Sequence, residues 1–327
     1  MKTLEFEPAV SKGAVSAPPS GWDYFADRAF RRLAQAGAWA ILLLLAFILW
    51  SIGGKAWIAM RDHGIAFITS SHWDVSRQQF GILPQIWGTV YSSLLALAIG
   101  GFFGVAMAIF LTQDFLPPRL ATLFRTIVEL LAAIPSVVYG LWGLFVVVPA
   151  IRPVAEFLFT RFGFIPFFGT TLSGPGMAPA ALVLAIMVLP TVAAVSQDAL
   201  RLVPYRVKEA AYGMGTTRWE AIFKVMLPAA ATGIFGALVL GFGRALGETM
   251  ALAMLIGNSN QISLSLFSPA NTLAALLALN FPEAGQREVQ VLMYAALVLL
   301  AITLVVNLAG EALMTFSSAS RQRRAAR

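Results

Sequence analysis

Two ionisable residues, Arg244 and Glu248, lie four positions apart inside the apolar stretch GFGRALGETMALAMLIGN (241–258). On a continuous helix this spacing places both side chains on one face. A guanidinium offers planar, paired donors to a tetrahedral oxyanion, and a nearby carboxylate would orient it and neutralise it when no anion is bound. The same spacing also suits an ion pair that only packs. We therefore treat Arg244 and Glu248 as candidate substrate-pathway residues.

The composition defines the class of protein that surrounds this pair. Hydrophobic residues make up 58% of the 327 residues, charged residues only 12%, and the mean hydropathy is +0.77. A soluble fold of this length could not hide so much apolar surface. The chain is predicted to be an all-α, polytopic membrane protein.

Six apolar stretches are long enough to cross a membrane. A bilayer core of roughly 30 Å needs about 20 apolar residues in a helix. The predicted spans are 34–53, 85–112, 126–149, 177–198, 229–257 and 289–313. Arg244 then lies well inside the fifth span, where a charge is expected to face the bundle interior or a polar cavity.

The basic residues indicate the orientation of the spans. Sixteen of the 23 Lys and Arg residues fall in the two terminal tails and in the segments that follow the second and fourth spans. By the positive-inside tendency these segments are cytoplasmic, so both termini are predicted to lie inside. This distribution also explains the net charge of +7 without nucleic acid.

Several kinds of chemistry are disfavoured. The chain has no cysteine, and its two histidines, His63 and His72, lack zinc-ligand spacing. It has no GxxxxGK[ST] phosphate-binding loop, so ATP is not expected to bind this chain in that way. We predict a transport subunit without catalytic residues, metal or cofactor of its own. A secondary transporter, with Arg244 and Glu248 coupling protons or sodium to cargo, is the alternative.

A charged segment, EAAYGMGTTRWEAIFKVMLP (209–228), separates the fourth and fifth spans. Pro204 can begin a short helix that Gly213 and Gly215 interrupt. Thr217 and Glu220 then have capping-box spacing, and a second amphipathic helix is predicted to end at Pro228. This helix, turn and helix would form a cytoplasmic knob that fits a groove in a partner.

The spacing in this segment resembles the EAA loop of ABC importer permeases. Glu209, Ala210 and Ala211 are followed by Gly215 and, after Val225, by Leu227 and Pro228. The family usually has Ile at the position of Val225. The resemblance implies that a coupling helix engages an ATPase subunit through this segment, with Trp219 on its apolar stripe. The candidate ATPase-coupling residues are Glu209, Ala210, Ala211, Gly215, Trp219, Leu227 and Pro228.

Longer motifs, DFLPPRL (114–120), ELLAAIPSVVYGLWGLFVVVP (129–149) and RALGETM with IGN, resemble the PstC-type permease subunit of the phosphate ABC importer. The similarity covers about 80–313 and implies the type I permease fold. It also implies phosphate as cargo, with Arg244 and Glu248 in its path. The implied partners are a homologous PstA-type permease, a PstB-type ATPase dimer that carries ATP and Mg²⁺, and a periplasmic PstS-type phosphate-binding protein in a bacterium. Molybdate and sulfate are the alternative cargoes.

The expected organisation follows from these features. It comprises a cytoplasmic tail (1–33) with a possible interfacial helix, a first span and external loop (34–84), and a permease core (85–313) that includes the coupling loop 199–228. A basic cytoplasmic tail (314–327) ends the chain. Pro135 is expected to kink the third span and free a carbonyl. Ser136 is expected to bond that backbone, and it is a weaker candidate for the substrate pathway.

Overall fold

The computed structural model describes residues 21–113 and 115–325, and contacts divide the chain into two units at Ser51 and Ile52. The first part of the predicted tail (1–20) and the last two residues of the basic tail lie outside the described residues. Helix α1 (Gly21–His63) begins in the first unit and continues into the second. The segment predicted as an interfacial helix is therefore continuous with the first span.

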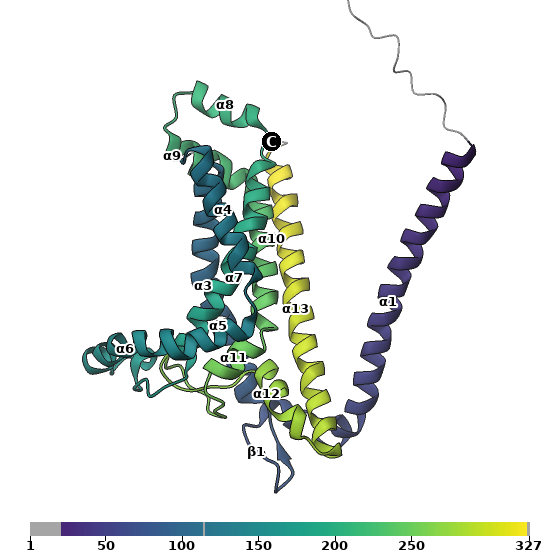
Figure 1. Ribbon diagram of the computed structural model, residues 1–327, viewed down its shortest axis with the longest axis vertical. Helices are drawn as coiled ribbons and strands as arrows, with labels where there is room; N and C mark the ends of the chain where they lie inside the picture. Colours follow the sequence, from purple (N-terminus) through teal and green to yellow (C-terminus); the bar gives the residue numbers. More distant parts are fainter. Residues whose placement is uncertain (1–20, 114, 326–327) are drawn as a thin grey trace, which may run out of the picture. The chain divides into compact units, whose positions relative to one another are not determined.

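The second unit is built around four long helices, which lie side by side in Figure 1. They are α3 (Leu83–Thr112), α7 (Met177–Arg201), α10 (Leu227–Leu246) and α13 (Gln286–Ala325). In α7, 61% of the most apolar window is buried, against at most 33% in any other candidate span. Helix α7 is therefore the centre of this unit, with α3 and α10 packed against it.

Glycines bring these helices into close contact. A Cβ atom at Gly100 of α3 would lie 2.4 Å from the carbonyl oxygen of Ala185 on α7. One turn later, a Cβ at Gly104 would lie 2.9 Å from Val192. The contact advances in the same direction along both helices, so α3 and α7 run parallel. The two glycines Gly100 and Gly104, four positions apart, thus mark the helix crossing that such spacing predicts.

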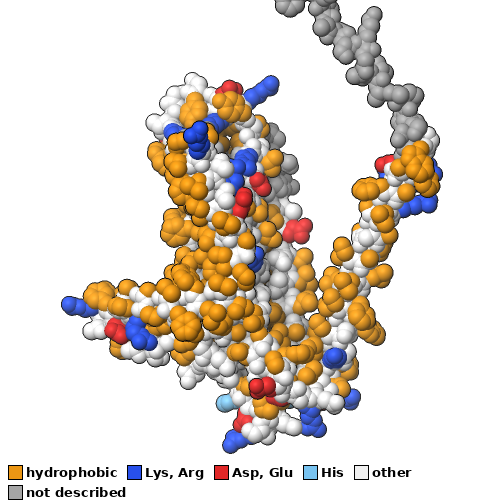
Figure 2. All heavy atoms as spheres, in the orientation of Figure 1, with side chains coloured by type: hydrophobic (Ala, Val, Ile, Leu, Met, Phe, Trp, Pro, Cys, Tyr) orange, Lys and Arg blue, Asp and Glu red, His pale blue; other side chains and the backbone are white. Residues whose placement is uncertain are grey.

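The two ends of the second unit differ. One end, which we call the loop end, carries α8 (Tyr205–Gly213) and α9 (Arg218–Glu220). The other, which we call the hairpin end, carries α2 (Ala66–Thr69) and the antiparallel strands β1 (Trp73–Asp74) and β2 (Gln79–Phe80). Figure 2 shows hydrophobic side chains over most of the length between these ends. This distribution suits a lipid-facing surface.

Polar contacts hold the hairpin end together. The Thr89 hydroxyl of α3 accepts a hydrogen bond of 2.9 Å from the Leu273 amide at the start of α12 (Leu273–Asn280). Thr89 therefore anchors α12 to the bundle.

In the hairpin turn, the Ser76 hydroxyl donates to the Asp74 carboxylate at 2.6 Å, and this bond lowers the pKa of Asp74 below its usual value.

The third predicted span, 126–149, is wrong as a single helix. Helix α4 (Pro118–Ala133) ends before Pro135, and α5 (Ser136–Trp142) starts a new helix. A π-helical segment (Gly143–Val147) joins α5 to α6 (Val148–Phe162). A residue before proline is disfavoured in the helical region, and Ile134 is extended, with φ −68° and ψ 127°.

The break at Pro135 changes the course of the chain. Figure 1 shows α5 and α6 lying crosswise to the four long helices. Among the described residues six helices are long and apolar enough to cross a membrane, and the third is 136–162 rather than 126–149. Arg152 and Arg161 lie beyond the predicted third span, in what the predicted spans make an outer loop, but the structure places both on α6.

Replacing Gly100 with Ala should destabilise the protein, because the new methyl group would collide with the Ala185 carbonyl. Overpacking of this kind costs about 1–3 kcal/mol. We expect a lower thermal unfolding midpoint for the purified protein in detergent. Gly53→Ala is the matched control, since a Cβ at this helical site meets nothing within 4 Å. Equal midpoints for the two variants would contradict the close crossing of α3 and α7.

Candidate functional site

Arg244 lies in the last turn of α10, near the middle of the bundle. A Cβ at Gly241 would meet Val188 and Val192, which lie at the centre of α7. Arg244 is less than one turn beyond Gly241, so it is level with the middle of α7. Its side chain is exposed within this chain. A guanidinium at this depth requires a polar surrounding, such as a cavity or a partner surface, rather than lipid.

The fifth predicted span, 229–257, is interrupted directly after Arg244. Helix α10 ends at Leu246 with Gly247 as its C-cap, and α11 (Met250–Leu255) begins three residues later. Arg244 therefore lies at a helix C-terminus, where the unpaired carbonyl groups favour a positive charge. From the spacing of four between Gly243 and Gly247, the sequence predicts a close helix crossing, but Gly247 ends the helix.

The break also separates Glu248 from Arg244. The Glu248 carboxylate accepts a hydrogen bond of 3.4 Å from the Ala251 amide in the first turn of α11. No ion pair joins Glu248 to Arg244 in the described part of the chain. The predicted i, i+4 pair is thus not formed, because the two residues are not on one continuous helix.

Pro135 leaves a backbone carbonyl without its helical hydrogen bond, and a tyrosine rather than Ser136 donates to it. Proline has no N–H to donate to the carbonyl four residues earlier, which belongs to Leu131. The Tyr139 hydroxyl donates to this carbonyl at 2.8 Å. Tyr139 also lies within electrostatic range of Arg244. Ser136 is half-buried at the start of α5, and the backbone role expected of it belongs to Tyr139.

At the loop end, α8 presents the first part of the EAA-like segment. Glu209 and Ala210 are exposed, whereas Ala211 is buried. Met214 ends the helix with 77% of its surface exposed. Of the two adjacent alanines, only Ala210 is therefore accessible to a partner.

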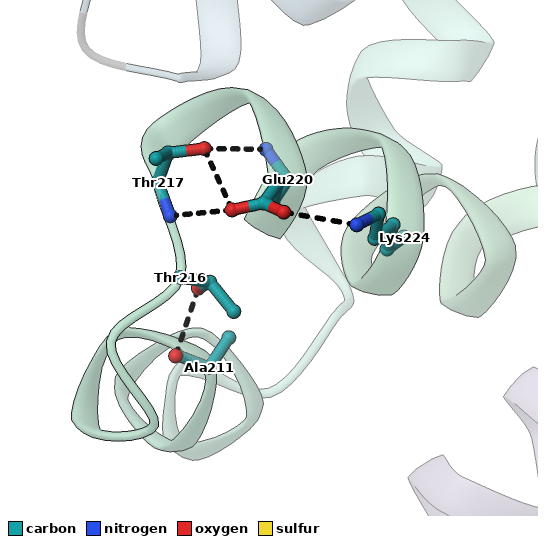
Figure 3. Close-up of polar contacts among 5 residues, drawn as sticks. All are labelled: Ala211, Thr216, Thr217, Glu220 and Lys224. Atoms are coloured by element: carbon teal, nitrogen blue, oxygen red, sulfur yellow. Dashed lines mark hydrogen bonds and ion pairs between the residues drawn. The ribbon is translucent and has the colours of Figure 1, made fainter.

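The turn after α8 has the predicted glycine and capping box. Gly215 has φ +80°, a conformation that favours glycine. The Thr216 hydroxyl donates to the Ala211 carbonyl at 2.8 Å and closes the turn onto α8 (Figure 3). The Thr217 hydroxyl accepts from the Glu220 amide, and the Glu220 carboxylate accepts from the Thr217 amide at 3.1 Å. This exchange fixes the start of α9.

The predicted end of the second helix at Pro228 is wrong. A π-helical segment (Ala221–Met226) joins α9 to α10, and Pro228 lies in the first turn of α10. The chain is thus helical without interruption from Arg218 to Leu246. Because proline cannot make the usual α-helical bond, a local π-helical turn accommodates it. Leu227 packs beside Leu200 and Ile234.

Trp219 is part of an aromatic cluster that the sequence did not indicate. Its ring centroid lies 5.3 Å from that of Phe115, in the connection between α3 and α4, and 5.9 Å from that of Phe223. The Arg218 guanidinium lies 4.2 Å from the Phe115 ring centroid and donates to the Gln113 carbonyl. Trp219 keeps 57% of its surface exposed. It therefore anchors α9 and leaves an exposed aromatic surface at the loop end.

Solved structures define the class of protein. A chain of the MetNI methionine ABC transporter in inward-facing conformations has a TM-score of 0.54 and 18% identity, covering 72% of this chain and 95% of that chain. A chain of a bacterial alginate ABC transporter has a TM-score of 0.53 and 17% identity, covering 86% and 96%. The fold is that of ABC importer permeases.

Sequence relatives define the family. The model of the binding-protein-dependent transport system inner membrane component matches residues 100–322. A phosphate transport system permease protein PstC from Pasteurella multocida is 40% identical, covering 85% of this chain and 88% of that protein. A PstC from Mesorhizobium japonicum is 39% identical, covering 86% and 87%. The chain belongs to the family of binding-protein-dependent transport system inner membrane components and is a multi-pass transport subunit.

Removing the Tyr139 hydroxyl should destabilise the break between α4 and α5. Tyr139→Phe leaves the Leu131 carbonyl without its donor, at a cost of about 1–3 kcal/mol for a buried group. We expect a lower unfolding midpoint in detergent and faster hydrogen exchange around residues 131–139. Tyr205→Phe is the control, because Tyr205 is 70% exposed. A midpoint that falls equally in both variants would contradict this role.

Proposed function

We propose that this chain is the permease subunit of an ATP-driven importer of inorganic phosphate and forms half of the translocation pathway. The exposed guanidinium of Arg244 at the middle of the bundle carries the proposal. Two relatives that are phosphate transport permeases are 39% and 40% identical to this chain over 85–86% of its length. An anion in transit would meet the paired donors of Arg244 in a region of low dielectric constant.

The partners follow from the same proposal. Arg244 is exposed within this chain, and a homologous, PstA-type permease would cover it and enclose the pathway. A periplasmic phosphate-binding protein of the PstS type would deliver the ion at the hairpin end. The loop end and both termini would lie in the cytoplasm, in line with the predicted distribution of Lys and Arg.

The loop end would dock on a dimer of PstB-type ATPase subunits. Exposed Ala210, Met214 and Trp219 give α8 and α9 an apolar contact surface beside the charge of Glu209. ATP and Mg²⁺ would bind the ATPase subunits, and this chain would transmit their closure. Alternating access would follow as the long helices move between states open to opposite sides.

The test is the uptake of labelled phosphate into vesicles that contain the assembled importer, with and without internal ATP and with sulfate and molybdate as competitors. We expect uptake that needs ATP and resists both competitors. ATP-independent uptake would favour a secondary transporter, and strong competition would indicate another oxyanion as cargo.

Arg244→Gln should abolish uptake in these vesicles while the complex still assembles, because the neutral amide cannot attract an anion to this depth. Arg161→Gln, an exposed change at the end of α6, is the control and should transport normally. Unimpaired uptake by Arg244→Gln would remove Arg244 from the pathway.

Gly215→Ala should weaken the coupling of ATP hydrolysis to transport. A Cβ here would meet nothing within 4 Å, so its effect comes only from the positive φ of +80°. An alanine in this conformation costs about 1–2 kcal/mol. The ratio of phosphate imported to ATP hydrolysed should fall, whereas Gly213→Ala, in the helical part of the same loop and equally free of contacts, should retain it. An unchanged ratio in Gly215→Ala would show that the turn is not needed for coupling.

A further inference from the structure

A polar cavity of about 230 Å³ lies between α4 and α7, on the loop-end side of Arg244. Its charged and amide side chains are Arg125, Glu129, Gln197, Asp198 and Arg201. The lining residues recur at spacings of three and four on each helix, so one face of α4 looks onto one face of α7. Figure 2 shows acidic and basic side chains together where Figure 1 draws α4.

The cavity holds polar groups that have no partner among the described residues. Gln197 is only 5% exposed, and its side-chain amide makes no hydrogen bond in this part of the chain. The Nε atom of Arg125 is buried and likewise without a partner. Arg125 and Glu129 are four positions apart, a spacing that favours an ion pair on a helix, but they form none among the residues described. Buried donors left in this state normally indicate a missing ligand or water.

The side chains around the cavity match a protonated oxyanion. Arg125 offers charged donors and Gln197 offers a neutral one, whereas the Arg201 guanidinium lies 3.9 Å from the carboxylate of Asp198, with which it forms an ion pair. The Glu129 carboxylate can only accept hydrogen bonds when it is ionised. Inorganic phosphate keeps at least one P–OH group at neutral pH and can donate to such a carboxylate, whereas sulfate is fully ionised and cannot. A carboxylate in this position would therefore repel sulfate and accept phosphate.

The cavity continues the path that begins at Arg244. A Cβ at Gly241 would contact Val188 and Val192, so Gly241 lies between their levels on α7. Arg244 lies three residues farther from the loop end than Gly241, and Gln197 lies five residues nearer to the loop end than Val192. At a rise of 1.5 Å per residue, Gln197 is therefore about 15 Å closer to the loop end than Arg244. Tyr139, within electrostatic range of Arg244, bonds the Leu131 carbonyl next to Ala132, which lines the cavity. Tyr139 thus lies between Arg244 and the wall of the cavity.

We propose that this cavity is a second phosphate-binding site, occupied after Arg244 and before release at the loop end. Arg125 and Gln197 donate to the ion, and Glu129 accepts from its P–OH group. The assignment rests on the proposed function, because it takes phosphate as the cargo. It adds residues that would distinguish phosphate from sulfate inside the membrane.

The absence of cysteine from the chain permits a direct test by thiol labelling. Ala194→Cys places one thiol at the wall of the cavity, and Ala132→Cys places one at the opposite wall. The complete importer in lipid is treated with a cationic thiol reagent, with and without a non-hydrolysable ATP analogue, and labelling is read on this chain after denaturing electrophoresis. Inorganic phosphate should slow labelling several-fold in at least one state, and sulfate at equal ionic strength should not.

Further variants and an activity assay sharpen the result. Thr122→Cys, an exposed site on α4 outside the cavity, should label at the same rate with and without phosphate. Adding Arg125→Gln to Ala194→Cys should remove the protection, and adding Glu129→Gln should allow sulfate to protect as well. Each single-cysteine importer is also assayed for ATP-dependent phosphate uptake.

The outcomes separate this site from the proposed function. Equal labelling with and without phosphate at both walls, in importers that still take up phosphate, would overturn the second site and leave the proposed function intact. Equal protection by sulfate in the Ala194→Cys importer would overturn the role of Glu129. Protection that survives Arg125→Gln would overturn the role of Arg125.

Discussion

The cost of a charge within the membrane is the constraint on which the rest of the structure depends. A guanidinium at this depth is unfavourable by at least about 2.5 kcal/mol on insertion scales, so lipid cannot be its surroundings. Helix α10 ends within three residues of Arg244, and the carbonyl groups of its last turn offset part of that cost. The rest of that cost must be offset by water, by an anion or by a facing subunit. The exposure of Arg244 in this chain is therefore what such a polar surrounding requires.

The helix breaks at Pro135 and Gly247 bring polar groups to the same region. At each break a side chain forms a hydrogen bond with a backbone group near the break. At Pro135 the Tyr139 hydroxyl bonds the Leu131 carbonyl, and after Gly247 the Glu248 carboxylate bonds the Ala251 amide. Backbone groups inside a membrane need such partners. The second bond occupies Glu248, so this residue can modulate the potential at Arg244 without forming an ion pair with it. An anion would then meet a guanidinium that no carboxylate within 21–113 or 115–325 occupies.

Local rules in the sequence predicted the membrane class, six apolar helices and the capping box at Thr217 correctly, because each depends on residues close in the chain. The errors concern proline and glycine within apolar stretches. At Pro135 and Gly247 the chain changes direction, whereas at Pro228 the helix continues through a π-helical turn. Hydropathy does not distinguish these outcomes, since all three lie in apolar sequence. The cluster of Trp219 and Phe115, 104 positions apart, depends on tertiary packing and has no local signal.

The continuity of α9 and α10 joins the two candidate functional regions physically. The last part of the loop 199–228 lies on the same helix as Arg244, from Arg218 to Leu246. Trp219 and Arg244 are therefore about 37 Å apart along its axis at 1.5 Å per residue. Gly215 and the capping box fix one end of this helix, and the contacts of Gly241 with α7 hold it near the other. A displacement of the loop by a partner would therefore reach Arg244 along one continuous helix. The π-helical segment just inside the loop is the point where this helix departs from ideal geometry, and it is where such a movement could be absorbed or transmitted.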